Sequence, residues 1–216
     1  MWRKTTAIYP AARKKVVVLN ELFQRTILLE NAKIVMVPFS SAYKESLKEI
    51  VFDKSIWTYM GFSIQTEDEL ERYVQSALLE KQEGKSYPFI ILDKESECVV
   101  GSTRLGNINF QNKRLEIGWT WYGTKYQGTG INQACKYELL HYVFEQMQFN
   151  RVQFSADVDN SRSQQAILKL GAKREGIFRH NYVDQHGNKR DDVYFSIIAD
   201  EWLDVKNKLF SEFQNK

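Results

Sequence analysis

The stretch YGTKYQGTGINQACKYELL, residues 122–140, sets Gly123, Gly128 and Gly130 just ahead of a segment with helical periodicity. Glycine lets the backbone approach a ligand without a Cβ in the way. The first N–H groups of a helix have no partner within it, and the helix dipole favours negative charge there. The stretch therefore predicts an anion site, most naturally for a phosphate or pyrophosphate. A tight turn ahead of a helix is the alternative.

Two common nucleotide motifs do not fit this loop. A P-loop needs Lys followed by Ser or Thr after its last glycine, whereas Ile131 and Asn132 stand there. A dinucleotide turn needs a third glycine, and that position is Gln133. The strands predicted before the loop are antiparallel, which also disfavours both motifs.

Periodicity and turn signals predict the elements that position the loop. Three short β-rich segments, residues 87–93, 98–109 and 114–123, read as an antiparallel meander. A helix is expected over 131–148, followed by an alternating strand over 151–158. Further helices are expected over 40–57, 66–84 (with a Thr66–Glu69 capping box), 160–171 and 199–213. A strand or hairpin is expected over 26–39, and a hairpin over 176–198.

The 216 residues suit one α/β domain, or one domain and a tail. We expect a single domain over 25–216, preceded by a basic arm over 1–24 whose five basic residues come before its first acid, Glu21. Three interpretations of the arm stay open: a poorly ordered segment, a strand or helix packed on the domain, and an organelle transit peptide.

The composition limits which classes of partner are expected. With 30 basic and 27 acidic side chains, the net charge of +3 is too small to indicate nucleic acid or an anionic membrane. No apolar run approaches 18 residues, so no membrane span is expected. Cys98 and Cys135 read as free thiols of a cytoplasmic protein. The three histidines lack the spacing of a metal site, so no metal is expected.

The order strand, KYQGTG, helix, strand, NSRS resembles the GNAT superfamily of acetyl-CoA-dependent N-acetyltransferases, whose signature is Q/R-x-x-G-x-G/A. The sequence departs from that signature at Lys125, which stands where the family has Gln or Arg. EIGWTWY before the loop and DNSRSQQAILKLGAKREG after it resemble the RimJ and RimL subgroup, named after ribosomal-protein acetyltransferases. The resemblance covers roughly residues 25–213.

This resemblance implies an α/β (α+β) fold with a mixed, mostly antiparallel central sheet that is splayed between its fourth and fifth strands. About four to five helices would flank the sheet. Acetyl-CoA would lie as co-substrate in the cleft between the splayed strands.

The same resemblance assigns cofactor-binding residues. The backbone of Trp119, Thr120 and Trp121 would pair with the pantetheine arm, and Asn160 and Ser163 would contact its end. The pyrophosphate would be held by Gln127, Gly128, Thr129, Gly130, Ile131 and Asn132, with Lys125 beside them. Helix capping is the alternative for Asn160, and strand packing is the alternative for the two tryptophans.

For catalysis the resemblance implies a base for the attacking amine, and Glu116 is the candidate; a solvated strand residue is the alternative. Glu175 is a second candidate. The family's usual acid, a Tyr, is replaced by Ile167, so Ser163, Tyr182 or water would protonate the leaving thiolate. Cys135 lies on an apolar helical stripe and reads as a buried structural thiol.

The expected function is transfer of an acetyl group from acetyl-CoA to a primary amine, on a protein N-terminus or a small molecule, by direct attack in a ternary complex. A CoA-binding sensor with a degenerate active site and a nucleotide-binding regulator are the alternatives. Monomer and homodimer both stay open.

Overall fold

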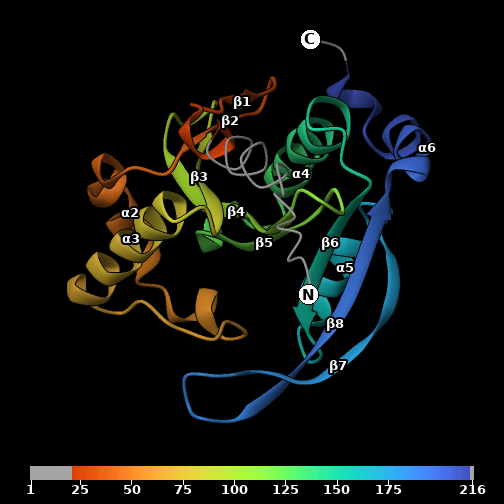
Figure 1. Ribbon diagram of the computed structural model, residues 1–216. Helices are drawn as coiled ribbons and strands as arrows, with labels where there is room; N and C mark the ends of the chain where they lie inside the picture. The colour runs from red at the N-terminus through yellow and green to blue at the C-terminus, as the bar shows by residue number, and fades with distance from the viewer. Residues whose placement is uncertain (1–20, 215–216) are drawn as a thin grey trace, which may run out of the picture.

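The computed structural model describes residues 21–214 and is built on one eight-stranded sheet (Figure 1). The order is β1-β2-β3-β4-β5-β6-β8-β7, and all neighbours are antiparallel except β5 and β6. The predicted mixed, mostly antiparallel sheet is confirmed. The strands are β1 (Leu29–Glu30), β2 (Ile34–Pro38), β3 (Ser86–Asp93), β4 (Val99–Asn109), β5 (Arg114–Tyr122), β6 (Arg151–Asp157), β7 (Lys173–Val183) and β8 (Lys189–Ile198).

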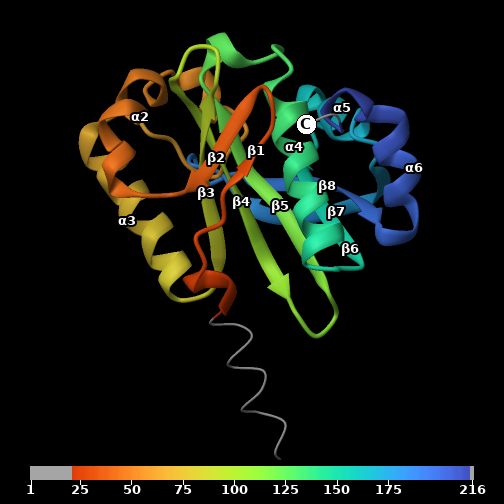
Figure 2. The ribbon, with the colours of Figure 1, turned by 90° about the horizontal axis from the view of Figure 1, so that it is seen from above.

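Helices cover both faces of this sheet (Figure 2). One core cluster lies beneath α2 and α3 and includes Trp57 and Trp121. A larger cluster lies beneath α4 and α6. The helices are α2 (Lys44–Val51), α3 (Glu67–Gln82), α4 (Ile131–His141), α5 (Ser161–Leu168) and α6 (Ala199–Leu209). The predicted capping box of Thr66 and Glu69 starts α3.

The sheet splits where β5 leaves β6. Their parallel ladder joins only Arg114–Glu116 to Arg151–Gln153. β5 then runs on to Tyr122 without a β6 partner, while its register with β4 shifts and Trp119 takes a φ of +50°. The backbone groups on this edge of β5 are left for another partner. The predicted splay is confirmed, and the two strands that separate are β5 and β6 because the two-residue strand β1 adds one to the expected count.

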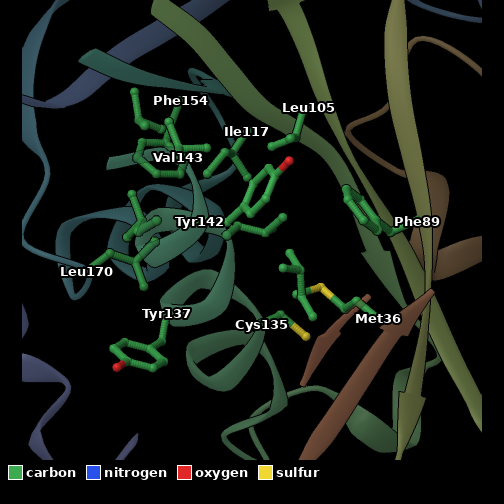
Figure 3. Packing of buried hydrophobic residues seen from close by; sticks show 14 of the residues in the cluster. Met36, Phe89, Leu105, Ile117, Cys135, Tyr137, Tyr142, Val143, Phe154 and Leu170 are labelled. Atoms are coloured by element: carbon green, nitrogen blue, oxygen red, sulfur yellow. The ribbon is translucent and has the colours of Figure 1, made fainter. Parts of the chain in front are cut away.

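α4 carries the centre of the larger cluster. Figure 3 shows Cys135 on α4 facing Met36 among apolar side chains. Cys135 is fully buried, and burial raises the pKa of its thiol to about 12, so the thiol is protonated at neutral pH. The prediction of a buried structural thiol is confirmed.

Three of the predicted helices are shorter than expected, and one of them, α6, ends at Leu209 ahead of a 3-10 turn, Ser211–Phe213. The segment 40–57 forms α2 between two 3-10 turns, because the Trp57 indole donates to the carbonyl of Val51 at 2.8 Å and ends the helix there. α4 passes at residue 142 into a π-helical turn, Tyr142–Gln146, in which Met147 N donates to the Tyr142 carbonyl. Periodicity alone does not separate these geometries.

Residues 1–20 of the basic arm predicted over 1–24 lie outside the described residues. Residues 21–24 are helical, Leu22 is buried in the larger cluster, and Phe23 packs against it. Within residues 21–214 no helix is long and apolar enough to cross a membrane.

Candidate active site

A cleft of about 390 Å³ opens where β5 and β6 diverge. Its walls come from β5, the glycine loop, α4, β6, α5 and the segment after α2. Eight residues assigned from the sequence to cofactor binding line it together: Trp119, Thr120, Trp121, Gln127, Gly128, Asn132, Asn160 and Ser163.

The glycine loop has the backbone geometry of an anion site. Gly128 and Gly130 have φ of +81° and +87°, and no side chain caps α4. The first N–H groups of α4 are therefore left for an outside acceptor. Gln127 and Thr129 brace the loop from within by donating to the carbonyls of Tyr122 and Tyr126 at 3.0 and 2.7 Å. Such a site suits a pyrophosphate.

The other four loop residues assigned to cofactor binding do not line the cleft. The ammonium of Lys125 lies over the ring of Tyr126, 4.8 Å from its centroid. The carbonyl of Thr129 accepts a hydrogen bond from Lys33 Nζ, and Gly130 is the N-cap of α4. Ile131 is buried, so only its backbone is available to a ligand.

Asn160 and Ser163 meet at the start of α5. Asn160 Oδ1 accepts from Ser163 N at 3.0 Å, so Asn160 is the N-cap residue. Both residues also line the cleft. The capping and binding roles of Asn160 are therefore compatible.

Glu116 lies at the last rung of the β5–β6 ladder and is 5% exposed. Asn107 Nδ2 and Gln153 Nε2 donate to its Oε2 at 2.8 and 3.2 Å, and Ser155 Oγ donates to its Oε1 at 2.8 Å. A Cβ added to Gly118, in the cleft wall, would lie 3.4 Å from Oε1. Glu116 is thus a fixed, buried carboxylate beneath the cleft wall.

The other candidate acids and bases are occupied elsewhere. Glu175 forms an ion pair with Arg151 and accepts from Ser196, and this pairing lowers the pKa of its carboxyl. It does not line the cleft. Tyr182 donates to Asp157 Oδ2 at 2.6 Å, and burial, with this partner, raises the pKa of the phenol. Tyr182 is therefore a poor proton donor at neutral pH.

The aromatic residues divide between cleft and core. Trp121 donates to the hydroxyl of Tyr73 at 3.0 Å and packs against Trp57 in the smaller cluster. Tyr59 lines the cleft, whereas Phe62 packs on Trp57. Trp119 is 38% exposed and lies over Gly106, where a Cβ would come within 2.4 Å of the indole.

Sequence reasoning missed two features of the cleft wall. Lys136 on α4 is buried and lines the cleft; its signal was a charge on the face of α4 that also carries Asn132. Asp157 at the end of β6 is held by Arg190 at 2.8 Å as well as by Tyr182. Arg190 lies 33 residues away on β8, and spacing alone cannot show such a partner.

The family model described as "Acetyltransferase (GNAT) domain" matches residues 33–173, which include the splay, the glycine loop and α5. The chain belongs to the GNAT acetyltransferase family. It is accordingly an N-acetyltransferase by family, and enzymes of the GNAT family generally use acetyl-CoA as co-substrate. The cleft, with its anion loop and free β5 edge, fits a nucleotide thioester of that kind.

Three relatives of the chain carry acetyltransferase names. The uncharacterized N-acetyltransferase YnaD of Bacillus subtilis (strain 168) is 24% identical over 73% of this chain and 89% of its own. YdaF of the same strain, provisionally named a ribosomal N-acetyltransferase, is 35% identical over 47% of this chain and 55% of its own. A crystal structure provisionally titled an acetyltransferase, from T. thermophilus, is 29% identical with a TM-score of 0.78, covering 86% of this chain and 96% of that one.

Among residues 21–214 no group of three or more His, Cys, Asp or Glu side chains is arranged to hold a metal ion. The polar side chains that line the cleft provide hydroxyls, amides, the carboxylate of Asp157 and the cations Lys136 and Arg162, while the carboxylate of Glu116 lies beneath the wall.

Proposed function

We propose that this GNAT enzyme transfers the acetyl group of acetyl-CoA to a primary amine, on a protein N-terminus or a small molecule, by direct attack in a ternary complex. The observation that supports it most is the position of Glu116. Its carboxylate lies beneath the same cleft wall, residues 117–122, that offers an unpaired strand edge. The same wall would thus offer a strand edge to the thioester and a carboxylate to the amine that attacks it.

Acetyl-CoA would bind along this wall. Its pyrophosphate would accept hydrogen bonds from the N–H groups at Gly128 to Asn132, and its pantetheine arm would complete the edge of β5 at Trp119 to Trp121. The free N–H groups at the start of α4 and the divergence of β5 from β6 support this placement. Asn160 and Ser163 would contact the thioester end of the arm from the start of α5.

The chemistry requires a neutral amine. An α-amine has a pKa near 8 and a lysine near 10.4, so a base assists at neutral pH. We assign that role to Glu116, acting directly or through a water held near Gly118. The nitrogen attacks the thioester carbon, the N–H proton passes to Glu116, and backbone N–H groups of β5 stabilise the oxyanion.

The acceptor would reach the thioester between the segment after α2 and the β7–β8 hairpin. Figure 1 shows that hairpin reaching toward the segment between α2 and α3. A Cβ on Gly61 would lie 3.5 Å from the ring of Tyr182, so the two segments touch. The name of YdaF supports a protein N-terminus as acceptor. We also propose a cytoplasmic location, which the free thiols of Cys98 and Cys135 support.

A panel of peptide N-termini and small amines, incubated with acetyl-CoA and weighed by mass spectrometry, tests the proposal. A gain of one acetyl group on an amine, with equimolar release of CoA thiol, is expected. Tight CoA binding with no acetylated product from any amine would favour the sensor alternative. Displacement of CoA by ATP or NAD would favour the nucleotide-binding regulator.

A further inference from the structure

Lys136 is a buried lysine in the wall of the cleft for which the proposed chemistry has no role so far. It is 5% exposed and projects from α4 toward β5. Its Nζ donates to Thr120 Oγ1 at 2.6 Å and to Thr103 Oγ1 at 3.4 Å. Among residues 21–214, no acidic side chain forms an ion pair with it.

The ionisable groups around Lys136 leave its charge uncompensated. On α4 the Cys135 thiol is protonated at neutral pH, and on β5 burial raises the pKa of the Tyr122 phenol well above its usual value. The other charged residues that line the cleft are Asp157, which forms an ion pair with Arg190, and the cation Arg162. Burial lowers the pKa of Lys136 to about 8. The buried ammonium therefore loses its proton more readily than an exposed lysine, and an anion that binds beside it would be stabilised.

The reaction generates an anion in this cleft. When the C–S bond breaks, CoA leaves as a thiolate, whose conjugate thiol has a pKa near 8.5. Three other side chains of the cleft wall are poor donors: Ile167 is apolar, Tyr122 is held protonated by burial, and the arginine Arg162 does not release its proton. The pKa of Lys136, about 8, is by contrast close to that of the CoA thiol, so Lys136 can give its proton to the thiolate.

We propose that Lys136, held in place by the Thr120 hydroxyl, protonates the CoA thiolate as it leaves. This inference rests on the proposed function. The amine nitrogen forms the C–N bond, the electron pair of the C–S bond goes to sulfur, and the proton moves from Lys136 Nζ to that sulfur. The neutral Lys136 then regains a proton from solvent after CoA departs, so protons and electrons balance.

The pH profile of a Lys136→Met variant tests the proposal with a readout that packing alone does not move. At pH 7 the variant is expected to lose about 10²-fold in kcat, the lower end of what a general acid supplies. The ratio of wild-type to variant rates is expected to fall as the pH rises through about 8, because wild-type Lys136 then loses its proton. The KM for acetyl-CoA is expected to change little.

Cys135→Ala is the matched control, since it alters a buried neighbour on the same helix without removing a charge. It is expected to keep the wild-type pH profile. A wild-type to Lys136→Met ratio that is flat between pH 6 and pH 9.5 would overturn the proposal, as would a Lys136→Met rate equal to that of the wild type.

A second measurement needs neither catalysis nor a folded variant. The thiol of CoA bound to the wild-type enzyme is titrated by the ultraviolet absorbance of its thiolate. The positive charge of Lys136 is expected to lower the pKa of the bound thiol below that of free CoA. Binding with an unshifted thiol would overturn this proposal alone, whereas failure of CoA to bind would overturn the proposed function with it.

Discussion

The carboxylate of Glu116 lies directly beneath Gly118, with Oε1 3.4 Å from the position that a Cβ on Gly118 would occupy. Glycine at 118 therefore keeps the buried carboxylate close to the cleft wall. Asn107, Gln153 and Ser155 hold Glu116 from the other sides. The carboxylate that we propose as the base is thus fixed at the point where β5 and β6 begin to separate.

Substitution of Gly128 tests whether the glycine loop binds the pyrophosphate, because a Cβ added there meets no protein atom within 4 Å. In Gly128→Ala the methyl group would instead meet the bound pyrophosphate and strain a backbone with φ of +81°. We expect the affinity for acetyl-CoA to fall at least 10-fold by calorimetry.

Gly187→Ala provides the control, because Gly187 also has a positive φ, +84°, and open space around its Cβ position. It lies in the β7–β8 turn, away from the loop. Both variants should lose similar stability from backbone strain, of about 1–2 kcal/mol. Equal acetyl-CoA affinity in the two variants would refute the assignment of the loop.

Much of the fold was predictable because local patterns and tertiary packing agree. Alternation marked β6, whose Val152, Phe154 and Ala156 are buried. The Thr66 capping box fixed the start of α3. The end of α2 was not predictable, because it depends on an indole hydrogen bond from Trp57.

The residues of the candidate site were likewise predictable only in part. Residues carried by a contiguous motif, such as Gly128 and Asn160, were named from the sequence and line the cleft. The partners of Glu116 were not, because Ser155 lies 39 residues from it and meets it only across the sheet. Lys136 was missed because its burial depends on two threonines from separate strands.

Asn160→Asp separates capping from binding. An Asp side chain still accepts from Ser163 N, so the start of α5 and the melting temperature should be preserved. The amide donor is lost and a negative charge enters the cleft, so the KM for acetyl-CoA should rise several-fold. If Asn160 only caps α5, the kinetics of Asn160→Asp will match those of the wild type.

Leu22→Ala tests where the folded unit begins, which we propose to be at or before residue 21. Leu22 is 7% exposed, and its truncation should cost about 2–5 kcal/mol of unfolding free energy. Leu28→Ala is the control, because Leu28 is 56% exposed and should cost little. Chemical denaturation compares them; equal stabilities would show that residues before 25 lie outside the core.

Lys136→Met should stabilise the enzyme without ligand. The pKa of Lys136 is lowered by burial from 10.5 to about 8, which corresponds to about 3 kcal/mol. Because the unfolded chain binds the proton more tightly, this cost is fully present below pH 8 and disappears as the pH rises toward 10.5. The variant's gain in melting temperature should therefore be largest at pH 7 and shrink by pH 10. A gain independent of pH would mean that Lys136 is not buried as a cation.

Glu116→Gln removes the proposed base while keeping the size and shape of the side chain. Asn107 and Gln153 both donate to Oε2, so the amide oxygen of Gln can take that place, while its NH₂ group donates to Ser155. The fold and the acetyl-CoA affinity should therefore survive. Only the ability to accept the proton of the amine is removed.

The decisive measurement is kcat/KM for the acceptor amine, in the wild type and in Glu116→Gln, from pH 7 to pH 9. If Glu116 is the base, kcat/KM falls by about 10²-fold or more at pH 7, and the loss narrows at higher pH because more of the amine is already neutral. A loss that stays constant with pH would mean that Glu116 positions the amine without accepting its proton. An unchanged rate at pH 7 would show that Glu116 is not the base.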